Sequence, residues 1–452
     1  MSNRLFKEFD SVTAKQWKQK IQFDLKGADY NDTLVWQTNE DISVKPFYHA
    51  DDFKEQPEVT NTETTTWKIC QSIFVADVKN ANQKAIDAIE RGAESIKFIV
   101  PSETVSINDL LKGINLALTP LHFKLQFLSE TYVKQLTAIS SNTNIYTDVI
   151  YNLAKNGNWY HSLNDDFYKF KAITAHTKSF SVDASLYQNA GANIIQQLAY
   201  SLAHANEYLN YFEESKTILP TLKISFNVSV GTNYFFEIAK LRALRMLWKV
   251  LAAEYHIKPT CYILATPTKR NKTLYDYNNN MLRTTTECMS AILGGANNVY
   301  NLPYDAIYHK DNEFGERIAR NQLLVLKHES YFDVVNNPSD GAFYIESLTN
   351  QLTEKALDLF KNIEENGGFL KQLKQGTIQR KIKENATKED AQFNAGEEVL
   401  LGTNKHPNTE DKMKQELELY PFVKTNQRKT LIEPIIEKRL AEKIEQERLK
   451  NE

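Results

Sequence analysis

The sequence predicts an α/β protein built on a TIM, or (β/α)8, barrel, and two observations support this fold class. From Trp67 onward, short runs rich in β-branched residues alternate with segments whose apolar residues recur every three or four positions. This alternation is typical of a parallel sheet with crossover helices. The chain has 452 residues, which suits one barrel of about 250 residues with additions at both ends.

Eight strands are expected, as a barrel requires. They are 67–75, 95–100, 121–128, 145–151, 178–184, 221–230, 260–265 and 297–301. Helices are expected between most of them, at 80–92, 131–139, 190–213, 233–255 and 278–293. In the fourth helix, for example, Tyr234, Ile238, Leu241 and Trp248 share one face. Active sites of barrel enzymes lie at the carboxyl ends of the strands, so functional residues are expected there.

We divide the chain into three parts. These are an N-terminal helix and extended arm, the barrel, and a polar, helical C-terminal extension, at 1–63, 64–370 and 371–452. Further helices are expected at 13–26, 312–329, 345–366 and, as a charged helix, 430–452. Two glycine pairs, Gly294-Gly295 and Gly367-Gly368, follow helical segments and lack the spacing of phosphate-binding loops, so we expect them to end those helices.

Composition and charge argue against several classes of function. Lys and Arg number 54 against 57 Asp and Glu, for a net charge of −3, which gives no indication of nucleic-acid binding. No apolar stretch approaches the ~20 residues that span a bilayer, and the N-terminus has no signal-peptide pattern, so we expect a cytoplasmic protein without a membrane partner. Cys70, Cys261 and Cys288 lie far apart, and we expect reduced core residues and no metal site.

Several polar residues could be assigned a catalytic role. Glu237, Arg242 and Arg245 are charged residues in an apolar helix, and we expect the two arginines to pair with acidic groups on neighbouring elements or on another subunit. Asp183 and Asn227 lie near strand ends that face the presumed pocket and could contact a small molecule. The roles of Glu237 and Glu346 remain open.

Long segments resemble the methylmalonyl-CoA mutase family. The strongest is NYFFEIAKLRALRMLW at 233–248, which is similar to a phenylalanine-rich strand-to-helix segment of that family. Other matches are QNAG at 188–191, NNNMLRTTTECMSAILGG at 278–295, ERIARNQLLVLKHES at 316–330 and GAFYIESLTNQLTEKALDLFKNIEENGG at 341–368. The resemblance implies a barrel, a coenzyme A thioester threaded through the barrel axis, and adenosylcobalamin bound between the barrel and a separate C-terminal domain.

The chain differs from the active members of this family at the positions of their catalytic and substrate-binding residues. Where they place a Gly-Tyr-His run whose histidine donates a hydrogen bond to the thioester carbonyl, this chain has Ala184-Ser185-Leu186, and leucine cannot donate. Where they carry Arg-Thr-His, this chain has Tyr262-Ile263-Leu264. The Thr-x-Arg-Gln-Tyr-Ala-Gly loop of the first strand is also missing. We expect a collapsed pocket, filled by side chains such as Leu186 and Tyr187.

The cobalamin module of the family is not expected in this chain. The sequence contains no Asp-x-His-x-x-Gly segment, whose histidine ligates cobalt in the family. The residues after Gly368 are too few for a flavodoxin-like module of about 130 residues once the polar tail is counted. No cofactor and no catalytic residue are therefore expected here, with the family's catalytic positions replaced by Leu186, Tyr262 and Leu264.

The resemblance and these departures together imply a non-catalytic subunit of a heterodimeric methylmalonyl-CoA mutase. Its homologous catalytic large subunit would bind adenosylcobalamin and interconvert methylmalonyl-CoA and succinyl-CoA, and this chain would stabilise it. Residues 1–63 and the helices of 312–366 are the expected contact surface. Two alternatives remain: an independent acyl-CoA isomerase-like or acyl-CoA-binding barrel, and a scaffold or coenzyme A sensor unconnected to the mutase.

Overall fold

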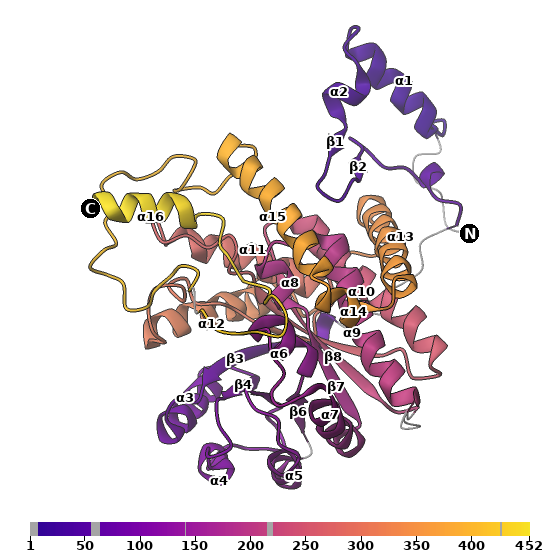
Figure 1. Ribbon diagram of the computed structural model, residues 1–452. Coiled ribbons are helices and arrows are strands. Elements are labelled where there is room, and N and C mark those ends of the chain that lie inside the picture. Colours follow the sequence, from indigo (N-terminus) through magenta and orange to yellow (C-terminus); the bar gives the residue numbers. More distant parts are fainter. Residues whose placement is uncertain (1–7, 56–63, 141, 215–219, 425–426) are drawn as a thin grey trace.

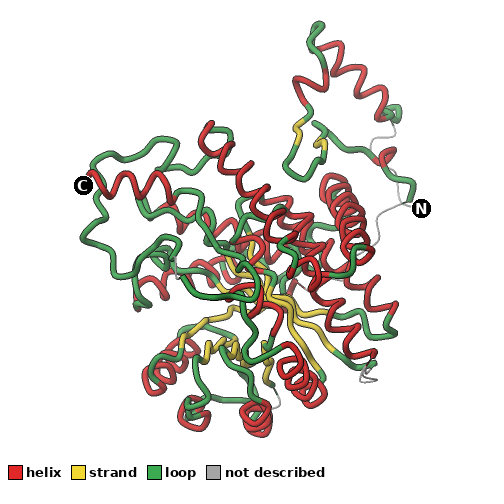
Figure 2. The backbone as a smooth tube through the Cα atoms, viewed as in Figure 1, coloured by secondary structure: helices red, strands yellow, loops and turns green. Residues whose placement is uncertain are grey.

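The barrel is an eight-stranded parallel sheet with helices around it (Figures 1 and 2). The structure is a computed structural model that describes residues 8–55, 64–140, 142–214, 220–424 and 427–452. The strands are β3 (Lys68–Phe74), β4 (Ser95–Val100), β5 (Leu121–Leu125), β6 (Thr143–Tyr146), β7 (Ser179–Asp183), β8 (Lys223–Val230), β9 (Cys261–Pro267) and β10 (Asn298–Tyr300). All eight expected strands are present, so the predicted fold class is confirmed.

The strands follow the order β6-β5-β4-β3-β10-β9-β8-β7, and every hydrogen-bonded pair is parallel. The two ends of this order meet through side chains. The Ser181 hydroxyl donates to the carbonyl of Thr147 at 3.1 Å, and the Asp183 N–H donates to Asp148 Oδ2 at 2.7 Å. These two bonds close the sheet into a ring.

The helices around the ring match the predicted helices to within a few residues. They are α3 (Val78–Glu90), α5 (Glu130–Ile139), α9 (Ile194–Glu214), α10 (Tyr234–Glu254), α11 (Asn279–Leu293), α12 (Glu313–His328) and α13 (Phe343–Glu365). As predicted, the two glycine pairs lie where helices end: Gly295 and Gly367 have φ of 85° and 98° just after α11 and α13.

Other helices were not predicted. These are α2 (Tyr30–Leu34), α4 (Ile107–Leu111), α6 (Val149–Asn156), α7 (Leu163–Thr177), α8 (Ser185–Asn189), α14 (Phe369–Lys374) and α15 (Thr377–Ala395). The predicted strand 145–151 is wrong beyond Tyr146. Asp148 stops it, because its carboxylate accepts the Tyr151 N–H at 2.8 Å and so caps α6.

The two faces of the barrel sheet have different environments. Residues facing outward, such as Phe98 and Phe123, pack with Trp248 and other apolar helix residues into one large core. Residues facing the barrel axis alternate with them and are largely polar, as at His122 and Lys124 of β5. The apolar core therefore holds the fold together, and the axial interior is free to carry polar groups.

An N-terminal arm, residues 8–55, stands away from the body (Figure 1). It contains α1 (Ala14–Asp24), α2, the short hairpin β1 (Trp36–Gln37) and β2 (Ser43–Val44), and the 3-10 turn Ala50–Asp52. Ring contacts tie its second half to the body, with 5.4 Å between the ring centroids of Tyr48 and Tyr344 and also between those of Phe53 and Phe343. No residue of α1 is buried.

The C-terminal segment corrects another prediction. Helix α16 spans only Glu442–Asn451, so the predicted helix 430–452 is wrong over 430–441. Residues 431–440, which we call the strap, instead cross the carboxyl face of the barrel without regular secondary structure. The strap donates backbone hydrogen bonds to α6, to α8 and to the loop after β9, through Ile435 to Ala154 (2.7 Å), Lys438 to Asn189 (3.1 Å) and Leu440 to Arg270 (2.9 Å).

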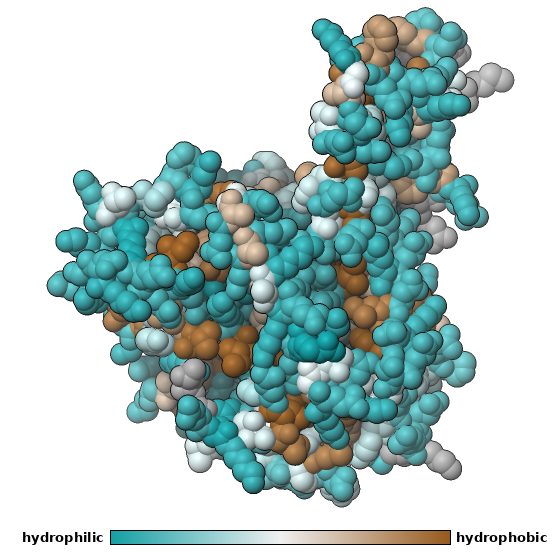
Figure 3. Space-filling model, turned by 45° about the horizontal axis from the view of Figure 1, so that its top comes forward, coloured by the Kyte–Doolittle hydropathy of each residue, from teal (hydrophilic) through white to brown (hydrophobic). Residues whose placement is uncertain are grey.

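The surface of the molecule is mostly hydrophilic in the view of Figure 3, with hydrophobic residues in separate patches. No helix in the described part of the chain combines the length and the apolar character that crossing a membrane requires.

Candidate functional site

A cavity of about 670 Å³ opens at the carboxyl ends of the strands, where barrel proteins place their sites. The polar lining includes residues from seven strands, β3 to β9: Ser72, Lys97, Lys124, Tyr146, Ser181, Asp183, Asn227 and Thr266. The strap contributes Glu437 to the rim. As predicted, Asp183 and Asn227 face this pocket.

A tight ion pair crosses the cavity. Lys124 Nζ lies 2.6 Å from Asp183 Oδ2 and 3.2 Å from the hydroxyl of Tyr151. Burial opposes ionisation of Asp183, but the charges of Lys124 and Lys97 outweigh burial and hold the pKa of Asp183 at about 2. Burial likewise disfavours the Lys124 charge, and Asp183 more than compensates, so the pKa of Lys124 is raised. Both groups are ionised at neutral pH.

Lys97 is a buried lysine of the cavity, whereas Lys155 and Lys269, which also line it, are exposed. It is 9% exposed, and its ammonium makes no hydrogen bond or ion pair to any residue that the structure describes. Its nearest recorded ring is that of Tyr146, at 5.9 Å from Nζ to the centroid. Burial and the charge of Lys124 lower the pKa of Lys97 to about 8, against the opposing effect of Asp183. Lys97 is therefore a buried positive charge with no direct ion-pair partner among the described residues.

Below the cavity, four side chains form what we call the barrel-floor network: His122, Tyr146, Tyr262 and Asn298. His122 Nδ1 lies 2.9 Å from the Tyr146 hydroxyl, and His122 Nε2 lies 2.8 Å from Asn298 Nδ2. The same amide nitrogen donates to the Tyr262 hydroxyl. Since Asn298 donates to Nε2, the neutral ring of His122 carries its proton on Nδ1. Burial and the charge of Lys97 lower the pKa of His122 to about 3.

The barrel-floor network closes the axis. Strands β5 and β9 are four places apart in the ring of eight and so stand on opposite sides, yet the rings of His122 and Tyr262 lie only 5.8 Å apart. His122 and Tyr262 precede the cavity residues Lys124 and Thr266 on their strands. The cavity is thus open at the mouth of the barrel and sealed toward the amino ends of the strands.

The three residues predicted to replace the family's catalytic residues are not gathered in the cavity. Leu186 lies in α8, fully buried. Tyr262 belongs to the barrel floor, and Leu264 packs with Cys70 and Tyr146 inside the ring. None of the three lines the cavity.

The prediction of a collapsed pocket filled by Leu186 and Tyr187 is wrong. Tyr187 points its hydroxyl at His204 Nδ1, 2.9 Å away, because α8 packs against α9 instead of turning into the barrel. The space above the floor therefore remains open.

The charged residues of α10 are structural. Arg242 pairs with Glu346 at 2.7 Å and Asp340 at 3.1 Å, which confirms the expected acidic partners. For Arg245 the neighbouring elements supply neutral acceptors instead: its guanidinium donates to the carbonyls of Cys261 (2.9 Å) and Gly295 (2.6 Å) and to the Asn297 amide oxygen.

Glu237 is buried next to the cavity wall. Its Oε2 pairs with Lys240 at 2.5 Å, and its Oε1 accepts the Gly231 N–H at 2.9 Å and the Gln188 amide at 3.0 Å. With these partners it holds the β8–α10 turn in place.

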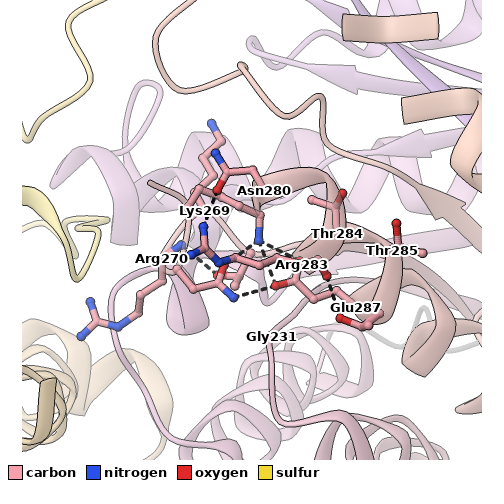
Figure 4. A network of polar contacts seen from close by, with 12 residues as sticks. Gly231, Lys269, Arg270, Asn280, Arg283, Thr284, Thr285 and Glu287 are labelled. Carbon is pink, nitrogen blue, oxygen red and sulfur yellow. Dashed lines mark hydrogen bonds and ion pairs between the residues drawn. The ribbon is translucent and has the colours of Figure 1, made fainter. Parts of the chain in front are cut away.

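A second polar network, shown in Figure 4, orders the loop between β9 and α11. Lys272 binds both carboxylate oxygens of Glu287 at 2.8 and 2.9 Å, and the Asn271 amide donates to Oε1 at 2.6 Å. Arg283 donates to Asn280 Oδ1 at 2.8 Å. The loop that this network fixes is the one to which Leu440 of the strap binds, so the network also positions the cover of the cavity.

Sequence reasoning missed Lys97 and Lys124 of the cavity, and His122 of the barrel floor. A signal was present: Lys97 stands within the apolar run SIKFIV, and His122 and Lys124 alternate within LHFKLQFL. A charged residue at an interior position of a buried strand needs a partner or a polar cavity, and here the axial interior provides one.

Comparison with known proteins identifies relatives over most of the chain. Residues 128–451 match the family described as methylmalonyl-CoA mutase. The methylmalonyl-CoA mutase small subunit of Porphyromonas gingivalis is 35% identical over 442 residues, covering 90% of this chain and 71% of that protein. The methylmalonyl-CoA mutase of Rhizobium meliloti is 27% identical, and the match covers 87% of this chain and 64% of that protein.

A second protein of Porphyromonas gingivalis, the methylmalonyl-CoA mutase large subunit, is 32% identical over 234 residues, covering 50% of this chain and 33% of that protein. Among solved structures, dihydropteroate synthase of Thermus thermophilus gives a TM-score of 0.33 at 12% identity, over 60% of this chain and 98% of that one, and we infer nothing from so low a likeness. The family match and the 35% identity over nine-tenths of the sequence place this chain in the methylmalonyl-CoA mutase family.

Proposed function

We propose that this chain is the non-catalytic subunit of a two-subunit methylmalonyl-CoA mutase, and that it stabilises a homologous catalytic large subunit. The observation that carries the proposal is the contact between Tyr262 and His122 across the barrel axis. The family threads its thioester substrate along that axis, and a floor of hydrogen-bonded side chains obstructs the path. Similarity to a small subunit over 90% of the chain supports the same role.

The strap supports the absence of cobalamin from this chain. In the family the cofactor lies between the barrel mouth and a further domain. Here Ile435, Lys438 and Leu440 bind backbone groups of α6, of α8 and of the loop after β9 at that mouth, and Glu437 reaches the cavity rim. These residues do not fit a corrin ring over the mouth. We therefore assign adenosylcobalamin to the partner subunit and assign this chain no step of the radical chemistry.

The N-terminal arm is the proposed contact surface for the large subunit, together with the helices of 312–366. Helix α1 has no buried residue, and the arm exposes Trp17 (44%) and Phe23 (79%). In Figure 3 the arm projects from the body with hydrophobic residues at its far end. Exposed aromatic side chains on a projecting element are typical of a surface that another protein covers.

The test is co-purification and activity. The chain is produced alone and together with a methylmalonyl-CoA mutase large subunit from the same organism, and conversion of methylmalonyl-CoA is measured with added adenosylcobalamin. We expect no turnover by the chain alone, turnover by the complex, and a higher melting temperature for the large subunit in the complex. Turnover by the isolated chain, or a large subunit equally stable and active alone, contradicts the proposal.

A second candidate is an independent acyl-CoA-binding or isomerase-like barrel, which the open cavity of about 670 Å³ favours. This candidate requires the isolated chain to bind coenzyme A thioesters or cobalamin. Equilibrium dialysis with cobalamin and with succinyl-CoA separates the two: binding of either by the isolated chain favours the independent barrel, and binding of neither favours the subunit.

A further inference from the structure

We propose that the barrel cavity is a binding site for a small organic anion with one carboxylate group, held by the ammonium of Lys97. This site lies wholly within the chain, so the proposal does not depend on the subunit role. The argument rests on three features: the charges around Lys97, a second unpartnered polar group in the same cavity, and the acidic rim.

The groups packed around Lys97 leave its ammonium without a direct ion-pair partner among the described residues. The titratable groups that face it come from the strands β3, β5, β6 and β7: Cys70, His122, Lys124, Tyr146 and Asp183. His122 is neutral, and Cys70 and Tyr146 have raised pKa values because they are buried. Asp183 is bound to Lys124 at 2.6 Å, which leaves Lys97 to bind a charge from outside.

Asn227 is a second group in the cavity without a partner. It is 4% exposed, it lines the cavity, and neither its amide nitrogen nor its amide oxygen has a hydrogen-bond partner among the described residues. A buried polar group left unpartnered costs about 1–3 kcal/mol, so such groups are normally satisfied by a ligand or water. Asn227 pairs with Asp183 in the β7–β8 register, and thus stands beside the ion pair of Lys124.

The charge balance favours a single carboxylate over a phosphate or a polyanion. Four lysines line the cavity (Lys97, Lys124, Lys155 and Lys269) against four carboxylates, so the lining has no excess of cations for a phosphate dianion, whereas the buried ammonium of Lys97 can hold one carboxylate. Asp183 lies inside the cavity, and Asp148, Asp311 and Glu437 also contribute to its lining. These carboxylates repel a more highly charged ligand. Ser72 and Ser181, also in the lining, suit a ligand that carries hydroxyl groups.

Ligand binding in this site should take up protons above neutral pH. The pKa of free Lys97 is about 8, and a bound carboxylate favours the charged amine, so its pKa rises on binding. Affinity should be constant below about pH 7 and should fall about tenfold per pH unit above the pKa of free Lys97.

The experiment is isothermal titration of the purified full chain with acetate, lactate, succinate and inorganic phosphate at pH 7 and pH 9. We expect saturable binding of acetate or lactate with a dissociation constant on the order of 1 mM. We also expect weaker binding of succinate and phosphate and a loss of affinity at pH 9. The variant Lys97→Met should lose at least tenfold in affinity. The matched control Lys79→Met removes an exposed lysine of α3 and should bind as the wild type does.

The variant Asp183→Asn sharpens the test. It frees Lys124 from its partner, so an anion site should gain at least threefold in carboxylate affinity, whereas a merely structural role for these residues predicts a loss. Three results overturn the proposal: no carboxylate binding by the wild type, unchanged binding by Lys97→Met, or tighter binding of phosphate than of acetate and lactate. If Lys97→Met does not fold, the direction of the change in Asp183→Asn decides.

Discussion

The floor and the mouth of the barrel are built from the same strands and differ in how their polar groups are satisfied. At the floor, His122, Tyr146, Tyr262 and Asn298 bond to one another. At the mouth, Lys97 and Asn227 have no protein partner among the described residues. The polar groups of the floor therefore stabilise the fold, whereas those of the mouth remain free to bind a ligand. Polar residues inside a barrel indicate a ligand only where the protein itself leaves them unsatisfied.

The largest expected effect comes from breaking the ring at the mouth. Asp148 accepts hydrogen bonds from Asp183 N–H (2.7 Å), Tyr208 OH (2.7 Å) and His204 Nε2 (2.9 Å) in addition to capping α6. Asp148→Ala leaves these donors buried without an acceptor, and should lower the free energy of unfolding by about 3–5 kcal/mol. Urea denaturation of wild type and variant measures this loss in the free energy of unfolding. Asp165→Ala, which removes an exposed helical ion pair, should cost under about 1 kcal/mol; equal losses would contradict the role of Asp148.

The floor should make stability depend on acid pH. The folded protein keeps His122 neutral down to about pH 3, whereas the unfolded chain takes up that proton at its ordinary pKa of about 6.5. The free energy of unfolding should therefore fall by about 1.4 kcal/mol per pH unit from pH 6 to pH 4 through this group. His122→Gln should reduce the slope by that amount, measured by denaturation at each pH. The exposed His406 provides the control variant His406→Gln, and a slope unchanged in His122→Gln would rule the effect out.

At the mouth, the stability of the protein should depend on alkaline pH, through the titration of Lys97. The folded protein releases the Lys97 proton at about pH 8, and the unfolded chain holds it to about 10.4. Stability should therefore rise with pH between these values, as the cost of the buried charge disappears. Lys97→Met should gain about 1–3 kcal/mol at pH 7 and nothing at pH 10.5. Melting temperatures of wild type and variant across this range measure the difference; a destabilised variant at pH 7 would place Lys97 among the structural residues.

The smallest expected effect concerns one hydrogen bond of the floor. Tyr262→Phe keeps the ring that packs 5.8 Å from His122 and removes only the hydroxyl that accepts from Asn298. Because Asn298 keeps its bond to His122, the loss should be about 1 kcal/mol, without any new substrate turnover. A loss above about 3 kcal/mol would show that the four residues act as one unit, so that their contributions cannot be added.

The sequence predicted the strands of the barrel well, because each is a short apolar run bounded by turns. It failed where a single side chain or a distant contact decides the structure. Asp148 ends a β-like run by capping α6. The strap has the composition of a helix, but Ile432 and Ile435 are 5% and 4% exposed in the core, so burial outweighs helix propensity there.

The site was harder to predict than the fold. Asp183 and Asn227 were found from their place at strand ends, where register alone brings them together. The role of Lys97 depends on which neighbours are already paired, and the partner of Lys124 comes from a strand 59 residues further along the chain. Ion pairs between strands form only when the barrel closes. A local sequence pattern therefore cannot predict them.

The position of the strap late in the sequence also affects how the protein folds during synthesis. It binds the segments that follow β6, β7 and β9, although it is made after all of them. During synthesis the barrel strands therefore leave the ribosome before the strap does. The barrel mouth stays uncovered until the strap itself has emerged, and only then can Glu437 reach the cavity rim.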